Sequence, residues 1–334
     1  MTSRISIHRI CVFGAGAVRG HLAAWLARAG LDVSVVARGP HLEAIRANGL
    51  RYVSDAEDFT VRVATSSDAR DLGPQDLVIA AVKAHGLPHV VDAMQPLLGP
   101  ETPVMFAING VPWWYFHGLP PEPGQPPASE RLARLDPGAR LWHSLGVRRA
   151  IGCVVTSPNE VSSPGVIRNN ATTNTFVIGE PDNTLSPRLQ QIASVLKPAL
   201  PGLSTSSAIR DVVWSKLMLN ITTSPLAALT MRPPITFSHD EPMLAVYRLL
   251  LAEGVRVAAS LGITVAADEE ARIARMRTVR HPPSMLQDLV AGRPLEIDAQ
   301  LLAVQDLARQ GGVDTPVLDT LLALLVQRMQ ADRP

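Results

Sequence analysis

The sequence predicts an α/β protein in which a doubly wound, mostly parallel sheet is followed by an all-helical C-terminal domain. In the first half, short apolar runs alternate with helix-like stretches, as in a parallel sheet with helical crossovers. From about Ile209 the pattern changes to long segments with apolar residues at three- and four-residue spacing. A length of 334 residues suits two domains, which we place at residues 1–208 and 209–334.

Composition and charge exclude several classes of protein. Hydrophobic residues make up 46% of the chain and charged residues 18%, which favours sizeable cores and excludes disorder. With 31 basic and 30 acidic side chains, the chain lacks the basic excess of a nucleic-acid binder. Apolar runs such as 77–82 are far shorter than the roughly 20 residues that span a membrane. Cys11 and Cys153 form no metal or redox motif, so we expect buried thiols in a cytoplasmic protein.

Each element follows from its local pattern. Strands are predicted at residues 9–13, 31–36, 76–82, 103–108, 151–156, 166–168 and 175–178, with a first helix at 18–29. The runs at 76–82 and 103–108 are almost entirely apolar, which is typical of strands buried on both faces. In the second half, helices are predicted at residues 209–229, 242–261, 267–279, 297–310 and 315–329.

Between residues 112 and 145 the alternation of strands and helices stops. Four adjacent aromatic residues precede a proline-rich stretch: Trp113, Trp114, Tyr115 and Phe116. Because such side chains need a packed environment, we predict a long ordered loop that is inserted into the first domain.

A glycine-rich turn joins the first strand to the first helix. Its residues are Gly14, Ala15, Gly16, Ala17 and Val18. Glycines at the first and third places permit a tight turn and let backbone N–H groups approach a pyrophosphate at the helix N-terminus. The turn indicates a dinucleotide site, with a ligand-free structural turn as the alternative. Arg19 replaces the third glycine of this fingerprint. An arginine fits there if the stem of its side chain points outward, and the side chain could then even reach a phosphate.

Residues at the ends of the next strands indicate the cofactor. Arg38 follows the second strand, where NAD sites carry an acid, and a guanidinium suits the 2′-phosphate of NADP. The alternative is a surface arginine. Lys83 and Asn109 follow the next two strands and should point toward the same crevice. Asn109 suits the nicotinamide or a substrate oxygen, although Asn109-Gly110 is equally a good turn.

No metal site is predicted. His85 and His89 have the spacing of metal ligands on a helix. However, Gly86 and Pro88 lie between them and argue against an ordinary helix there.

A polar stripe marks the first predicted helix of the second domain. Lys216, Asn220 and Ser224 are four residues apart and drift only about 80° around the axis, so they share one face of an otherwise apolar helix. Pro225 should release a backbone carbonyl and bend the helix. A partly desolvated lysine in this setting can donate a proton. The alternative is a solvated lysine at a helix edge.

Two more polar residues lie near predicted helix starts. Ser284, with Gln287 three residues later, fits a capping box, and the same helix N-terminus suits a carboxylate ligand. Glu296 precedes another helix and suits its dipole. Taken alone, both residues are explained more readily by structure than by function.

Together these motifs resemble those of the ketopantoate reductase family over nearly the whole chain. The most specific pieces, in this order and spacing, are residues 14–18, 81–84, 109–110, 214–220, 284–288 and 292–298. The resemblance implies a Rossmann-type domain that binds NADPH and a helical domain that closes over the substrate. It implies that Lys216 is the catalytic acid and that Asn220 binds the substrate. It further implies cofactor roles for Arg38 and Lys83.

The resemblance also implies active-site roles, toward substrate or cofactor, for Asn109, Ser284 and Glu296. We therefore expect NADPH-dependent reduction of a 2-oxo acid, with 2-dehydropantoate as the leading candidate. Lys216 would supply the proton, with Glu296 orienting the lysine or the substrate. Ser284 would hold the substrate carboxylate, and Asn220 with Ser224 a terminal hydroxyl.

The chain departs from the family pattern in three places. They are Arg19, Ser224 in place of a usual second asparagine, and the long segment at residues 111–145. Two alternatives therefore stay open: a reductase for a bulkier 2-oxo acid whose pocket is lined by residues 113–116, and a catalytically weak NADP-binding regulator. A homodimer is also expected.

Overall fold

The computed structural model describes residues 7–331 apart from 15, 172 and 267, and the chain forms two compact units. The first unit contains the chain up to Ile108 together with Trp113–Glu122 and Pro126–Ile209. The second contains Asn109–Pro112, Pro123–Gln125 and the chain from Arg210 onward. Two short segments of the first half of the sequence thus pack with the helical unit, which the sequence pattern did not predict.

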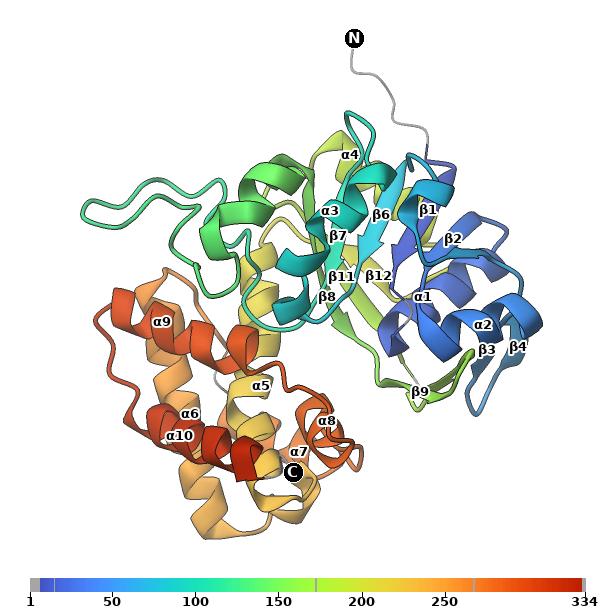
Figure 1. Cartoon of the computed structure of the whole chain (residues 1–334). Helices are drawn as coiled ribbons and strands as arrows, with labels where there is room; N and C mark the ends of the chain where they lie inside the picture. The colour runs from blue at the N-terminus through green and yellow to red at the C-terminus, as the bar shows by residue number, and fades with distance from the viewer. Residues whose placement is uncertain (1–6, 15, 172, 267, 332–334) are drawn as a thin grey trace. The chain divides into compact units, whose positions relative to one another are not determined.

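An eight-stranded sheet forms the centre of the first unit (Figure 1). Its strand order is β12 (Leu203–Thr205), β11 (Thr175–Gly179), β8 (Ala150–Thr156), β7 (Val104–Ala107), β6 (Leu77–Ala80), β1 (Arg9–Phe13), β2 (Asp32–Val36) and β5 (Ala64–Ser66). Every neighbouring pair is parallel except β8 with β11. The predicted mostly parallel sheet is confirmed.

Apolar sequences explain the burial of the central strands. All residues of β6 and β7 are buried, as expected for strands covered on both faces. The helices of this unit are α1 (Ala17–Arg28), α2 (Gly39–Asn48), α3 (Val91–Met94) and α4 (Pro187–Leu196). Of these, only α1 was predicted, whereas α2, α3 and α4 were not. The Gly39-Pro40 start of α2 has the composition of a turn, but proline is well tolerated in the first turn of a helix.

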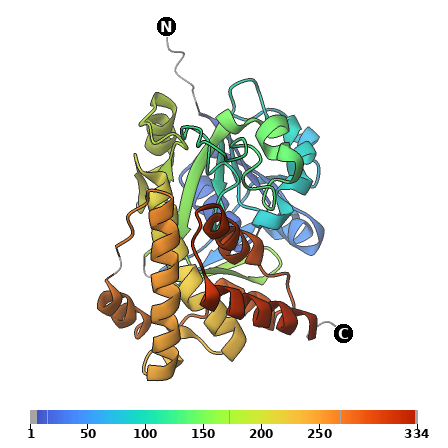
Figure 2. The same cartoon turned by 90° about the vertical axis from the view of Figure 1, so that its left-hand side faces the viewer.

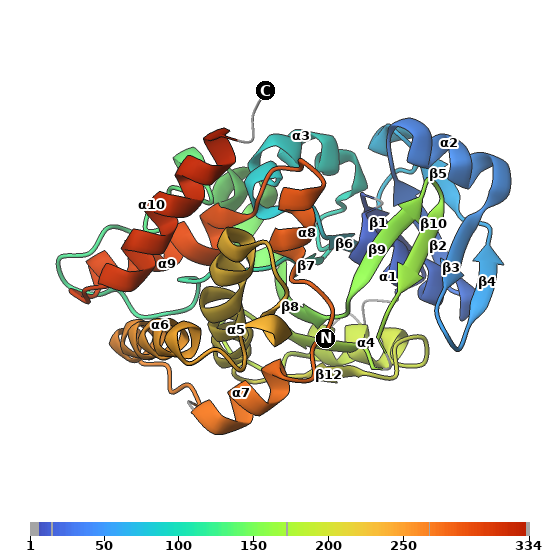
Figure 3. The same ribbon diagram turned by 90° about the horizontal axis from the view of Figure 1, so that it is seen from below.

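A second sheet of four strands packs against α1. Its order is β4 (Asp58–Val61), β3 (Leu50–Val53), β10 (Val166–Asn169) and β9 (Asn159–Ser163). Figure 3 shows the blue β3 and β4 beside the green β9 and β10, which come from distant parts of the chain. His21 and Trp25 of α1 contact the ring of Tyr52 in β3. Because α1 also contacts β1 and β2, it is enclosed on both sides.

The segment after β7 is ordered, as predicted, although part of it is helical. The four adjacent aromatic side chains are each at most 3% exposed. Trp113 packs edge-to-face against Phe106 of β7 and against Trp142. The guanidinium of Arg131 lies 3.7 Å from the ring centroid of Phe116. Short helical turns occupy Pro137–Ala139, Leu141–Gly146 and Val147–Arg149, where a loop was predicted.

These aromatic side chains therefore belong to the core of the first unit. Each of them is at most 3% exposed. The alternative of a bulkier 2-oxo acid stays a prediction.

The second unit is helical, as predicted. Its helices are α5 (Ile209–Thr230), α6 (Glu241–Ser260), α7 (Glu269–Met276), α8 (Ser284–Val290), α9 (Ala303–Gln310) and α10 (Pro316–Ala331). The long α6, orange in Figure 2, packs against the red α9 and α10. The buried carboxylate of Glu253 in α6 accepts hydrogen bonds from the N–H groups of Val317 and Leu318, at 2.8 and 2.9 Å, and so caps α10. None of the helices in the described residues combines the length and hydropathy of a membrane-spanning segment.

The predicted capping box at Ser284 is not formed. The N-cap of α8 is Pro283, and Ser284 is the first residue within the helix. Gln287 instead donates from Nε2 to the carbonyl oxygen of Pro282 at 2.8 Å. A proline at the N-cap position has no side-chain acceptor, so this helix starts without the predicted reciprocal bonds.

Candidate active site

The central parallel strands of the first unit end along one edge of the sheet. The residues near their ends pair in one row: Phe13, Val36, Ala80 and Phe106. The chain continues from three of these strands to Gly14, Arg38 and Lys83, which therefore emerge at this edge. The strand order reverses direction between β1 and β6, and doubly wound sheets bind ligands at such a point.

The glycine turn after β1 has the backbone that its residues suggest. Gly14 has a φ of +101°, a conformation that favours glycine, and its N–H donates to the carbonyl of Val36 at 2.8 Å. This bond ties the turn to the end of β2. Gly16 is the N-cap of α1, whose first residues are Ala17 and Val18. Ala15, which was predicted to bind the cofactor, lies outside the described residues.

Gly20, the residue after Arg19, lies against the second sheet. A Cβ at Gly20 would lie 2.4 Å from Cδ1 of Ile167 in β10, closer than atoms can approach. With a side chain at residue 20, either Ile167 or α1 would have to move. This contact is with the four-stranded sheet and not with β1, against which the third glycine of the fingerprint packs.

The Arg19 side chain does not point outward. A Cβ built at Gly14 would lie 2.2 Å from Nη1 of Arg19, and one built at Gly16 would lie 2.4 Å from Nη2. The guanidinium thus lies directly on the two glycines of the turn. The side chain thus folds back over the turn, where an outward stem was predicted, and its contact with a phosphate stays a prediction.

Arg38 and Lys83 lie close in sequence to the same strand ends. Arg38 is the N-cap of α2 and is exposed, so its guanidinium is accessible to a phosphate. Lys83 is half-buried and is the N-cap of the 3₁₀ turn Ala84–Gly86. β6 ends three residues before Lys83, earlier than predicted.

In the second unit, three predicted residues lie side by side. Nζ of Lys216 in α5 donates to Oδ1 of Asn109 at 2.6 Å. Nδ2 of Asn109 donates to Oε2 of Glu296 at 3.4 Å, a long bond. The side chain of Asn109 therefore bridges an ammonium and a carboxylate, and Glu296 is only 8% exposed. The ammonium of Lys216 is half-buried, and one of its three N–H groups is donated to a neutral oxygen.

The turn that carries Asn109 is held by the π-helical turn Asp298–Leu302. The N–H of Val111 donates to the carbonyl of Ala299 at 2.8 Å. Gly110 has a φ of +88°, and a Cβ there would lie 2.4 Å from the carbonyl carbon and oxygen of Ala299. Gly110 is therefore required by both its conformation and its close approach to Ala299. The sequence indicated the turn but gave no sign of Ala299 as its partner.

The remaining predicted substrate residues are placed individually. Asn220 and Ser224 follow Lys216 at four-residue steps on the continuous helix α5, Asn220 half-buried and Ser224 only 3% exposed. Pro225 lies inside that helix. Ser284 is exposed at the first residue of α8. The two hydrogen bonds that join Lys216, Asn109 and Glu296 do not involve Asn220, Ser224 or Ser284. The roles of these three residues stay predictions.

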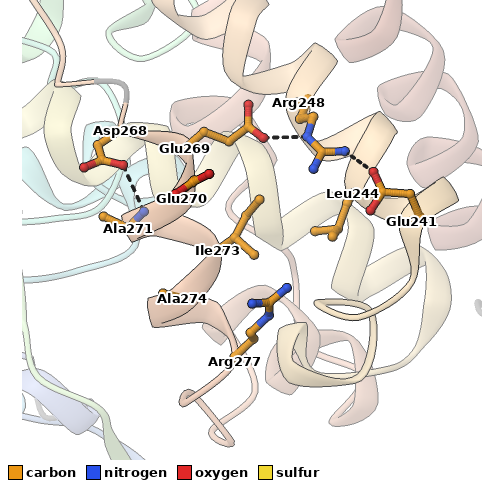
Figure 4. A pocket seen from close by; sticks show the side chains of 10 residues that line it. All are labelled: Glu241, Leu244, Arg248, Asp268, Glu269, Glu270, Ala271, Ile273, Ala274 and Arg277. Atoms are coloured by element: carbon orange, nitrogen blue, oxygen red, sulfur yellow. Dashed lines mark hydrogen bonds and ion pairs between the residues drawn. The ribbon is translucent and has the colours of Figure 1, made fainter.

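A pocket of about 660 Å³ lies between α6 and α7 (Figure 4). It is lined by Glu241, Leu244, Arg248, Asp268, Glu269, Glu270, Ala271, Ile273, Ala274 and Arg277. The guanidinium of Arg248 donates to Glu241 and, at 2.5 Å, to Glu269. The pocket contains none of the predicted site residues, so we assign it no part in catalysis. In the described part of the chain, no group of three or more His, Cys, Asp or Glu side chains could hold a metal ion.

Comparison with known proteins identifies similar sequences over almost the whole chain. Residues 10–112 match the family model described as "Ketopantoate reductase PanE/ApbA", and residues 208–329 match its C-terminal counterpart. A 2-dehydropantoate 2-reductase from Mesorhizobium japonicum is 42% identical over 327 residues, which cover 97% of this chain and 98% of the relative.

Solved structures show the same similarity in three dimensions. A candidate ketopantoate reductase from Ralstonia solanacearum MolK2 superposes with a TM-score of 0.90 and 39% identity, covering 98% of this chain and 99% of that one. The ternary structure of D-mandelate dehydrogenase with NADH and anilino(oxo)acetate has a TM-score of 0.80 at 19% identity, covering 97% and 98%. At 19% identity, the similarity to D-mandelate dehydrogenase shows a shared fold alone.

Proposed function

The chain belongs to the ketopantoate reductase PanE/ApbA family, and we propose that it reduces 2-dehydropantoate to pantoate with NADPH. The observation that carries this proposal is the contact of Lys216 with Asn109 beside Glu296, because it places a proton donor in a polar cluster within the helical unit. We assign cofactor binding to residues 1–208 and substrate binding to residues 209–334. The turn at Asn109 is the exception, since we assign it to substrate binding as well.

The residues at the sheet edge of the first unit fit a phosphorylated dinucleotide. The turn at Gly14 and Gly16 leaves backbone without Cβ atoms at the start of α1, which suits a pyrophosphate. Arg38 would bind the 2′-phosphate, and Lys83 a further part of the cofactor. The bound nicotinamide supplies the hydride.

Lys216 supplies the proton. As negative charge develops on the ketone oxygen, an N–H of the ammonium that is not donated to Asn109 bonds to that oxygen and then transfers its proton. Asn109 fixes the position of Nζ, and the carboxylate of Glu296 fixes which way the amide of Asn109 faces. Asn220 and Ser224 would bind the terminal hydroxyl of the substrate, and Ser284 its carboxylate.

Steady-state kinetics with NADPH and a panel of 2-oxo acids test the substrate. We expect the highest kcat/KM for 2-dehydropantoate over pyruvate, 2-oxoisovalerate and phenylpyruvate. A higher value for phenylpyruvate would favour a bulkier substrate in spite of the buried aromatic segment. Tight binding of NADPH without turnover of any acid would favour the regulator.

Replacing Arg38 tests the cofactor. Arg38→Ala should weaken NADPH binding by about 1.5–3 kcal/mol, or roughly 10- to 150-fold, because charge-assisted bonds to the 2′-phosphate are lost. The affinity for NADH, which lacks that phosphate, should stay the same. Fluorescence titration measures both dissociation constants. An equal loss of affinity for NADPH and NADH would show that Arg38 does not bind the 2′-phosphate.

A further inference from the structure

Arg19 occupies the surface where the fingerprint turn would meet a pyrophosphate. Its Nη1 and Nη2 lie 2.2 and 2.4 Å from the Cβ positions that Gly14 and Gly16 lack. Any side chain at either glycine would displace the guanidinium. In dinucleotide-binding turns these same glycines let the pyrophosphate approach the backbone at the helix N-terminus. The guanidinium is therefore in contact with the two residues that a bound pyrophosphate would face.

The packing of α1 accommodates the long side chain of Arg19. A third glycine normally permits the helix to approach the neighbouring strand at this position. Here Arg19 is half-buried, and its guanidinium lies over Gly14 and Gly16 at the start of the helix.

The start of α2 adds a second observation on this corner of the first unit. The N–H of Gly165 donates to Nδ1 of His41 at 2.9 Å, so a neutral His41 carries its proton on Nε2. That nitrogen is buried and has no hydrogen-bond partner among the described residues. Burial, and then the positive charge of Arg19, lower the pKa of His41 below its usual 6.5. His41 lies in the first turn of α2, next to the N-cap Arg38, and its buried Nε2 has no acceptor among the described residues.

We propose that Arg19 binds the pyrophosphate of the dinucleotide, a role that rests on the proposed NADPH-dependent activity. On binding, the guanidinium leaves the glycines and forms a paired contact with phosphate oxygens, for which its planar fork is suited. A pyrophosphate is common to NADPH and NADH, whereas a 2′-phosphate belongs to NADPH alone. Arg19 therefore sets the affinity for both cofactors, and Arg38 sets the preference between them.

The test compares Arg19→Gln with a matched control. Arg9→Gln removes the same charge from an exposed side chain at the amino end of β1, the opposite end of the strand from the turn. Isothermal titration calorimetry measures the dissociation constants of NADPH, NADH and adenosine 2′-monophosphate, which lacks a pyrophosphate. Thermal unfolding confirms that each variant is folded, and Arg19→Gly restores the usual fingerprint residue if the glutamine variant does not fold.

Arg19→Gln should weaken NADPH and NADH by the same factor, roughly 10- to 100-fold, as expected for lost charge-assisted bonds. It should leave adenosine 2′-monophosphate unchanged, and Arg9→Gln should leave all three probes unchanged. Unchanged or tighter dinucleotide binding by the Arg19 variants would overturn this inference, because the guanidinium would then be a bystander or an obstacle. Failure of the unaltered protein to bind either dinucleotide would overturn the proposed function as well.

Discussion

Gly110→Ala should disable the enzyme from a position that carries no reactive group. The substitution adds one methyl group beside Asn109. That group would lie 2.4 Å from the carbonyl carbon and oxygen of Ala299, and the backbone at residue 110 has a φ of +88°. Both features oppose any L side chain at this position.

The size of the expected loss of activity follows from the close contact with Ala299 and from the positive φ of residue 110. Ordinary carbon contacts are about 3.5–4.0 Å, so the turn and Ala299 must separate by at least about 1 Å. The positive φ adds a cost of order 1–3 kcal/mol. A shift of that size at residue 110 moves the adjacent Asn109 and breaks its 2.6 Å bond with Lys216. Because misplacing a catalytic group by about 1 Å costs about 100-fold in rate, we expect kcat to fall by that factor.

The assay is kcat at saturating NADPH and 2-dehydropantoate, with thermal unfolding measured in parallel. Gly312→Ala is the matched control, since Gly312 also has a positive φ, of +63°, but no atom within 4 Å of its Cβ position. The control should lose some stability and keep its kcat. If Gly110→Ala and Gly312→Ala had the same kcat and the same unfolding midpoint, the close approach to Ala299 would not position Asn109.

Two further predictions concern buried titratable groups. Burial lowers the pKa of His21 to about 4, so the folded protein binds this proton less readily than the unfolded chain, whose histidine has a pKa of about 6.5. The resulting contribution to stability is complete above pH 6.5 and is lost as the pH falls toward 4, to a total of roughly 3 kcal/mol. Urea unfolding at pH 7 and pH 4.5 should show this loss, and His21→Phe should reduce it; an equal loss in the variant would refute the assignment. Cys11 and Cys153 are buried, and burial raises the pKa of the Cys11 thiol to about 12, so a maleimide should label neither thiol until urea unfolds the chain. Rapid labelling of the native protein would contradict their burial.

The sequence predicted the elements with strong apolar patterns. β1 was predicted at its observed residues, and α5 to within one residue of its end. In both, a long or uninterrupted apolar pattern leaves one interpretation. β3 and β4 were missed because they are four residues long and β4 has no buried residue. They form with β9 and β10, which lie far away in the sequence, and no local pattern records that pairing.

The sequence predicted individual residues of the site but not the contacts between them. The polar stripe of α5 indicated Lys216, the position after a strand indicated Asn109, and the resemblance to a family indicated Glu296. The bridge formed by Asn109 depends on Gly110 and Ala299, which are brought together only by the folded chain. Similarly, Arg19 was recognised as a departure from the fingerprint, but its contact with Gly14 and Gly16 depends on side-chain conformation. The roles of Asn220, Ser224 and Ser284 stay predictions.

The catalytic role of Lys216 is tested most directly by single-turnover hydride transfer. We expect Lys216→Ala to slow the oxidation of bound NADPH by 2-dehydropantoate about 10²- to 10⁴-fold, the range for loss of a positioned general acid. NADPH affinity should stay near that of the unaltered protein, and Lys216→Arg should not restore the rate, because a guanidinium holds its proton too tightly. Lys197→Ala, which removes an exposed lysine at the end of α4, is the control and should have no effect. An unchanged single-turnover rate in Lys216→Ala would contradict the mechanism and require another acid.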